Sequence, residues 1–203
     1  IEEEVMSISE GSMWTGEPAN NDWEMAGINP KANKSLPFIR EAIVSGEIRK
    51  ADSLVTSDFF GSSESFGHFT SVGKLKIEFG NHSGKSSGYL RSLDLQNSLG
   101  LVEYKIGNIR YKREYFCSYP DRVLAIKFSA DKPAETSFRL GMDIVQDSSE
   151  TVIEDHTYIV KGFIDGNHRP FQVHIIVKNN GGTVGREGKF ITVSGADSVV
   201  VLL

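Results

Sequence analysis

Residue types that carry out acid–base, nucleophilic or metal chemistry are present in this sequence, but no catalytic spacing joins them. The five histidines are scattered, and none stands at metal-ligand spacing from another or from a carboxylate. The sequence contains no G-x-S-x-G nucleophile elbow, no H-E-x-x-H zinc motif and no phosphate-binding Walker loop. We therefore predict no catalytic residue, no metal site and no cofactor.

Three features could still carry a specific function, and each is weighed against an ordinary structural role. His68 lies in a loop of Gly, Ser and Phe residues, where binding sites often occur, and it is a candidate site residue. The glycine-rich segment Gly181–Gly188 would need to open a helix to cradle a phosphate, but strand-like residues follow it, so hairpin turns are expected. Cys117, the single cysteine, is interpreted as a small buried apolar residue on a strand rather than as a reactive thiol.

Aromatic and charged residues are densest in Arg110–Asp121. Basic residues between aromatic ones can bind single-stranded nucleic acid. The chain carries 27 acidic against 22 basic residues, however, for a net charge of −5. We therefore expect an ion-pair network between strands, in which Arg113 and Glu114 adjoin Asp94 and Arg91, and no nucleic-acid partner. No membrane partner is expected, since no apolar run reaches the roughly 20 residues that a spanning helix needs.

The elements that position these residues are mainly β-strands. Leu75, Ile77 and Phe79 alternate with charged residues, as in a strand with one buried face. Gly107-Asn108 joins two such runs and predicts a tight hairpin. Further strands are expected at 5–8, 123–128, 138–144, 158–160, 171–177, 190–193 and 199–203. Many strands separated by turn clusters predict a large antiparallel β-sandwich.

One helical insertion is expected near residues 32–56. Leu36, Ile39 and Ile43 recur at helical spacing, with Ser35 as the cap and Gly46 as the stop. A second short helix should follow at 47–55. The prediction is thus a single β-sandwich domain, 1–203, whose bare apolar strand at 199–203 and missing initiator Met suggest that both ends were cut from a larger protein.

Four segments together resemble the N-terminal β-sandwich (super-sandwich) domain of glycoside hydrolase family 95, the α-L-fucosidases, which is related to the N-terminal domain of family 65. Ser9–Pro18 is similar to the family's N-E-x-x-x-W-S-G-x-P, with Ser9 in place of Asn. Tyr89–Leu95 resembles Y-x-R-x-L-D-L, and Tyr111–Asp121 resembles Y-x-R-E-x-F-A-S-Y-P-D, with Cys117 in place of a small residue. Residues 181–197 resemble the closing G-G-x-V … V-x-G-A-D strands.

The resemblance implies a non-catalytic domain of an inverting α-L-fucosidase that needs no cofactor. The family's catalytic groups lie in an α/α-barrel downstream, so no catalytic residue can be carried over to this chain. The implied partners are that barrel and, in the parent enzyme, fucosylated glycans, and the implied localisation is secreted or periplasmic. The candidate substrate or interface residues are Trp14, Thr15, Gly16, Glu17 and His68, because an exposed Trp can stack on a sugar or plug a domain interface.

Two other classes of function remain open. The chain could be a carbohydrate-binding module, in which Trp14, Trp23 or the tyrosines form a platform for a sugar. A self-sufficient hydrolase is the third possibility, and the missing catalytic motifs argue against it.

Overall fold

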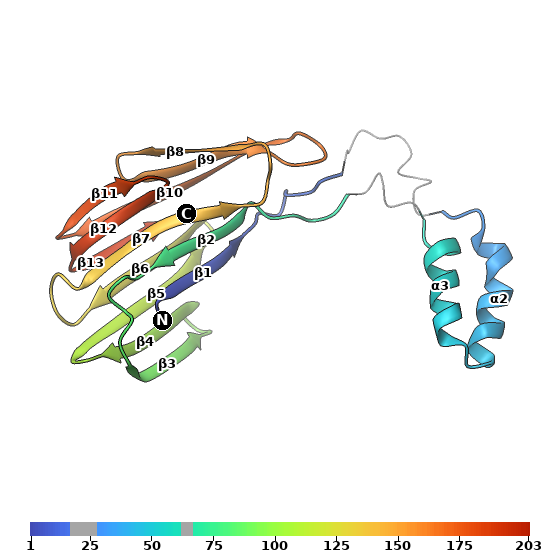
Figure 1. Cartoon of the computed structure of the whole chain (residues 1–203), viewed down its shortest axis with the longest axis horizontal. Helices are drawn as coiled ribbons and strands as arrows, with labels where there is room; N and C mark the ends of the chain where they lie inside the picture. Colours follow the sequence, from blue (N-terminus) through green and yellow to red (C-terminus); the bar gives the residue numbers. More distant parts are fainter. Residues whose placement is uncertain (17–27, 62–66) are drawn as a thin grey trace. The chain divides into compact units, whose positions relative to one another are not determined.

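The structure, a computed structural model, describes residues 1–16, 28–61 and 67–203, and within them the chain forms two antiparallel β-sheets and two helices (Figure 1). The five-stranded sheet consists, in spatial order, of β1 (Glu3–Ile8), β2 (Gly73–Glu78), β7 (Thr136–Ile144), β12 (Phe190–Ala196) and β11 (Thr183–Glu187). The eight-stranded sheet consists of β3 (Ser86–Asp94), β4 (Leu99–Ile106), β5 (Ile109–Ser118), β6 (Val123–Ala130), β13 (Ser198–Leu202), β10 (Pro170–Asn180), β9 (Thr157–Phe163) and β8 (Ser149–Glu154). The predicted β-sandwich is confirmed.

The core lies between the two sheets and follows from the alternation in the sequence. On β2, Leu75 and Ile77 are fully buried, whereas Lys74 and Lys76, which alternate with them, face outward. Ile126 of β6 and Val201 of β13 belong to the same buried cluster from the opposite sheet. Each large aliphatic side chain buried in this way contributes about 1.5–3 kcal/mol to folding.

Local turn chemistry sets the register of the hairpin between β4 and β5. Ile106 pairs directly with Ile109, so Gly107 and Asn108 form a two-residue turn. Gly107 has a φ of 59°, in the left-handed region that glycine adopts without strain. The predicted hairpin is confirmed.

The eight-stranded sheet has more strands than the sheet that covers it, and β3 at its edge is left uncovered, whereas Val102 and Tyr104 of β4 are buried. β1, the edge of the smaller sheet, faces β5, because Glu4 of β1 bonds to Arg113 and Tyr115 of β5. From Gly88 to Asp94, β3 is exposed on both of its faces. We call this edge, β3 with the adjoining Leu95, the overhang.

Arg113 lies inside the sandwich and joins its two layers. It is 3% exposed, and its Nη1 donates to Glu4 Oε2 at 2.7 Å. Its Nη2 donates to the Tyr104 hydroxyl at 2.7 Å and also to the Ile1 carbonyl. The predicted pairing with Asp94 is therefore wrong. β4 separates β3 from β5, so the acid that reaches Arg113 comes from the other sheet.

Two other details of this region differ from expectation. Glu114 pairs with Lys112 on its own strand, at 2.8 Å, instead of with Arg91. Cys117 is exposed, not buried. Cys117 shares the inward face of β5 with Arg113, but it lies near the end of that strand, where its side chain remains open to solvent.

The two helices belong to a second compact unit, residues 11–70 and 164–168, whereas the sandwich comprises 1–10, 71–163 and 169–203. Helix α2 spans Ala32–Val44 and α3 spans Ile48–Asp58. Gly46 ends the first helix with a φ of 75°, as predicted. Ser35 is not the cap, because α2 begins three residues earlier, and its hydroxyl donates to Asp58 at 2.6 Å. Neither helix is long and apolar enough to cross a membrane.

Candidate functional site

The second unit brings four of the predicted site residues together around one short β-bridge. Trp14 pairs with Phe69 in antiparallel fashion, and the Thr15 amide donates to the His68 carbonyl at 3.1 Å. One residue further along, the Thr70 amide donates to the Met13 carbonyl at 2.9 Å. These bonds hold the segment 13–16 alongside 67–70, two stretches that lie more than 50 residues apart in the sequence.

The Thr15 hydroxyl strengthens this contact. It accepts a hydrogen bond from the His68 amide at 2.9 Å and lies 3.2 Å from His68 Nδ1. Its own proton can go to that nitrogen or to the His68 carbonyl, 3.3 Å away. A Thr–His contact can activate a nucleophile when a third group orients the histidine. This hydroxyl already accepts from the backbone, so the geometry supports a structural clip rather than a nucleophile.

Asn167 fixes the far end of the segment. Its side-chain Nδ2 donates to the Trp14 carbonyl at 2.5 Å and to the Gly16 carbonyl at 2.9 Å. Gly67 allows the two backbones to approach, because a Cβ at this position would overlap the Gly16 amide. The loop conformation is therefore specified by backbone contacts, and the Trp14 side chain is left free of them.

The Trp14 and Phe69 rings form an exposed aromatic pair. Their centroids are 6.0 Å apart with an interplanar angle of 66°, an edge-to-face arrangement. Trp14 is 48% exposed and Phe69 49% exposed. Two large aromatic side chains that pack on each other and lie half open to solvent are typical of a contact surface.

The groups with the largest pKa shifts lie elsewhere, in the interior of the sandwich. Burial, helped by the charge of Arg113, lowers the pKa of His82 to about 4, and burial raises the pKa of Tyr104 to about 12. His82 Nδ1 and the Tyr104 hydroxyl are 2.9 Å apart. His82 is 3% exposed and stacks on Phe79, so this network stabilises the core and has no access to a substrate.

The structure thus places Trp14, Thr15, Gly16 and His68 in one cluster, and their role in binding or docking stays a prediction. Glu17 and Trp23 lie outside the described residues. Phe69 and Asn167 were missed as members of the cluster. The sequence marks Asn167 only as part of an Asp-Gly-Asn turn, and nothing local indicates where its amide points. Among the described residues, no group of three or more His, Cys, Asp or Glu side chains could hold a metal ion.

Comparison with known proteins covers the whole chain. The family model described as "Glycosyl hydrolase family 65, N-terminal domain" matches residues 1–203. This chain belongs to that family. Membership agrees with the two-sheet fold of the described residues.

The curated relatives are fucosidases. The chain is 27% identical over 229 aligned residues to "Alpha-L-fucosidase 2" of Arabidopsis thaliana, covering 100% of this chain and 26% of that protein. "Probable alpha-fucosidase A" of Aspergillus niger is 30% identical over 64% of this chain and 16% of its own length. The chain therefore spans about a quarter or less of the curated relatives it matches.

A solved structure described as a kojibiose phosphorylase from the human microbiome aligns with 63% of this chain and 21% of its own, at 10% identity and a TM-score of 0.45.

The residues that match the family motifs have structural roles in this chain. Arg113 joins the two sheets, as described above. Asp197 accepts from the Ala134 amide at 2.8 Å. Asp94 accepts from the amide of Gln96 at 3.0 Å and closes the turn after β3. Other motif residues face solvent instead, among them Trp14 and, on the overhang, Tyr89, Leu93 and Leu95.

Proposed function

We propose that this chain is the non-catalytic N-terminal domain of an α-L-fucosidase-like, inverting glycoside hydrolase, and that it packs against an α/α-barrel catalytic domain of the same polypeptide. One observation carries the proposal: the whole chain aligns with only 26% of a protein named as an α-L-fucosidase. The remainder of such a protein is long enough for a separate catalytic domain. Fucosylated glycans would then be substrates of the complete enzyme, which needs no cofactor, and the family suggests a secreted or periplasmic location.

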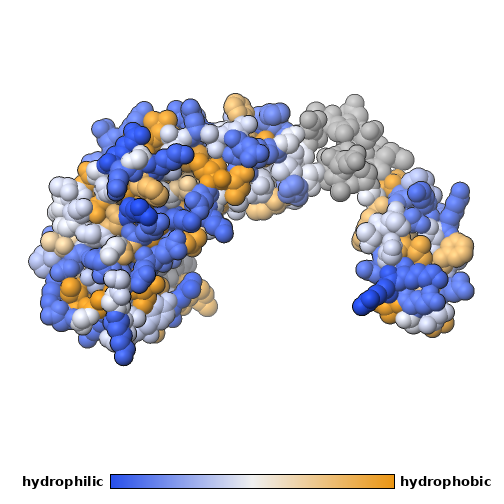
Figure 2. Space-filling view, in the orientation of Figure 1, coloured by the Kyte–Doolittle hydropathy of each residue, from blue (hydrophilic) through white to orange (hydrophobic). Residues whose placement is uncertain are grey.

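The distribution of exposed apolar side chains supports docking to another domain. On the overhang, Tyr89, Leu90 and Leu93 are 55%, 52% and 65% exposed, and the adjoining Leu95 is 81% exposed. Figure 2 shows hydrophobic atoms at the surface of this end of the sandwich. A strand exposed on both faces buries little by itself, and apolar surface of this kind usually marks an interface.

The aromatic pair of the second unit supports the same function. Trp14 and Phe69 pack edge-to-face on a hydrogen-bonded backbone and are half exposed, so both rings are open to a docking partner. A carbohydrate-binding module is the alternative. The angle of 66° between the two rings argues against it at this position, because rings that stack on a sugar chain would present a common flat surface.

Enzyme assays on two proteins test the proposal. The purified 203-residue chain should release no nitrophenol from an aryl α-L-fucoside above a heat-killed control. The full-length protein should hydrolyse the substrate, and NMR of the first product should show the β-anomer of fucose, as inversion requires. Turnover by the isolated chain that survives repeated purification, or retention of configuration by the full-length enzyme, would contradict the proposal.

A further inference from the structure

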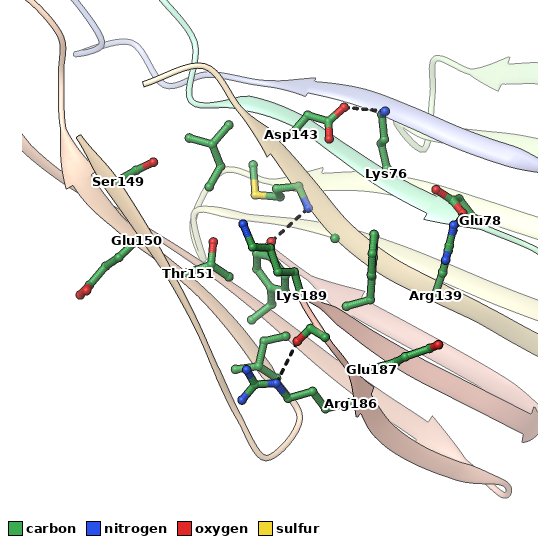
Figure 3. A pocket seen from close by; sticks show the side chains of 17 residues that line it. Lys76, Glu78, Arg139, Asp143, Ser149, Glu150, Thr151, Arg186, Glu187 and Lys189 are labelled. Atoms are coloured by element: carbon green, nitrogen blue, oxygen red, sulfur yellow. Dashed lines mark hydrogen bonds and ion pairs between the residues drawn. The ribbon is translucent and has the colours of Figure 1, made fainter. Parts of the chain in front are cut away.

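A cleft opens in the sandwich where two strands stop pairing. β12 pairs with β7 as far as Leu140, whereas β7 continues to Ile144 and remains paired with β2. The second half of β7 therefore lacks β12 as a neighbour. The turn between β11 and β12 and the edge strand β8 border the gap, and the resulting cleft has a volume of about 1170 Å³ (Figure 3). This volume slightly exceeds the usual range for small-ligand sites, about 300–1,000 Å³.

An aromatic ring with a fixed position lies at this cleft. Phe190, half-buried, rests against Gly141, where a Cβ would come within 2.7 Å of its ring. The guanidinium of Arg139 lies 4.7 Å from the ring centroid, and Arg139 is itself held by Glu78 at 2.5 Å. The ring is thus positioned by Gly141 and Arg139 before any ligand arrives, and it remains partly exposed.

The polar lining is balanced in charge and rich in both donors and acceptors. Four basic and four acidic side chains line the cleft, and two pairs neutralise each other: Lys76 with Asp143 at 2.5 Å, and Arg139 with Glu78. Ser149 and Thr151 of β8 contribute hydroxyl groups from the opposite wall (Figure 3). A lining without net charge does not favour an anion or a cation, and so many charged groups do not suit an apolar ligand.

We propose that this cleft binds a neutral oligosaccharide. Each sugar hydroxyl both donates and accepts hydrogen bonds, so it can be satisfied by neighbouring basic, acidic and hydroxyl side chains together. The apolar face of a pyranose ring can pack on the exposed part of Phe190. The inference is independent of the docking function, since the cleft lies at the turn between β11 and β12 and the overhang lies at the β3 edge.

Titration calorimetry of the full 203-residue chain tests this inference. The probes are 2′-fucosyllactose, cellohexaose and a xyloglucan heptasaccharide, with hexagalacturonate as an anionic oligosaccharide. At least one neutral probe should bind saturably, and hexagalacturonate should bind more weakly than that probe. Phe190→Ala should weaken the binding roughly tenfold through loss of the ring surface. Thr151→Val, which removes one hydroxyl and keeps the shape, should weaken it by about threefold to tenfold.

Phe116→Ala is the matched control, because Phe116, like Phe190, is a solvent-accessible phenylalanine on a strand, and it does not line the cleft. The Phe116→Ala variant should bind the neutral probe with the same affinity as the unsubstituted chain. Far-UV circular dichroism checks that each variant folds. If Phe190→Ala does not fold, Thr151→Val still tests the inference. Failure of every neutral probe to saturate, tighter binding of hexagalacturonate, or unchanged affinity in Thr151→Val would overturn the inference without affecting the docking proposal.

Discussion

At the scale of single residues, substitution of Trp14 tests whether this side chain serves in docking or in the core of the isolated chain. Its ring is 48% exposed and contacts Phe69 edge-on, so Trp14→Ala should lower the stability of the isolated chain by only about 0.5–1.5 kcal/mol. Phe128→Ala, at a residue 2% exposed in the core, should cost about 3–5 kcal/mol in the same thermal melts. In the full-length enzyme, Trp14→Ala should loosen domain docking by about 2–4 kcal/mol. A loss of stability in Trp14→Ala as large as in Phe128→Ala would rule out docking.

His82 makes the stability of the sandwich depend on pH. Burial and the nearby Arg113 charge lower its pKa from 6.5 to about 4, so the folded state prefers the neutral imidazole. The stability that depends on neutral His82 is therefore fully present above pH 6.5. It is lost as the pH falls towards 4, because the unfolded chain then binds a proton at His82 that the folded chain does not bind. We expect a loss of up to roughly 3 kcal/mol across this range.

Urea unfolding at several pH values checks this expectation. His82→Asn removes the titrating group and should flatten the profile between pH 6.5 and 4, after subtraction of the carboxylate titrations common to both proteins. A variant profile parallel to that of the unsubstituted chain would show that His82 does not titrate as proposed.

At the scale of elements, the hairpin of β11 and β12 depends on glycines for two different reasons. Gly182 has a φ of 63°, and a Cβ there would overlap the Ser194 carbonyl. Gly188, at the other end of β11, has a φ of 58°, but a Cβ there would meet open space. Gly188→Ala should cost about 1–2 kcal/mol from the left-handed backbone alone. Gly182→Ala should cost clearly more in chemical denaturation, and equal costs would contradict the overlap.

In the same hairpin, the alternation of apolar residues was sufficient to predict one strand, β12, but not the other, β11. The buried residues Ile191 and Val193 alternate with less buried ones, and β12 was predicted from this alternation. β11 was expected to be part of a glycine-rich turn, but Thr183–Glu187 pairs with β12 along its whole length. It has one half-buried apolar residue, Val184, so its sequence carries too little hydrophobic contrast to mark a strand.

At the scale of the whole molecule, the overhang should make the isolated chain self-associate. Sedimentation velocity at increasing concentration should show a rising average mass, because the exposed apolar side chains of β3 have no covering layer. Leu93→Asp combined with Leu95→Asp should shift the chain towards the monomer. Val145→Asp, at an exposed apolar residue outside the overhang, should leave the association unchanged. A chain that stays monomeric at all concentrations would argue against the overhang as an interface.

The sequence by itself determined the β-sandwich class, the helical insertion, most strands and the family. Those properties follow from local patterns, such as the alternation around Leu75 and Ile77 or the turn at Gly107, which each strand carries independently of its neighbours. It also selected Thr15 and His68 as candidates, although it could not show that the two are hydrogen-bonded.

Only the tertiary structure decided the partners across the fold. Glu4 reaches Arg113 because β1 faces β5, Asn167 clamps the Trp14 loop from a turn about 150 positions away, and the cleft exists because β12 stops pairing with β7 at Leu140. Such contacts depend on how sheets stack and where the shorter sheet ends. Residue periodicity shows which face of a strand is buried, but it contains no information about which side chain on the opposite layer will meet it.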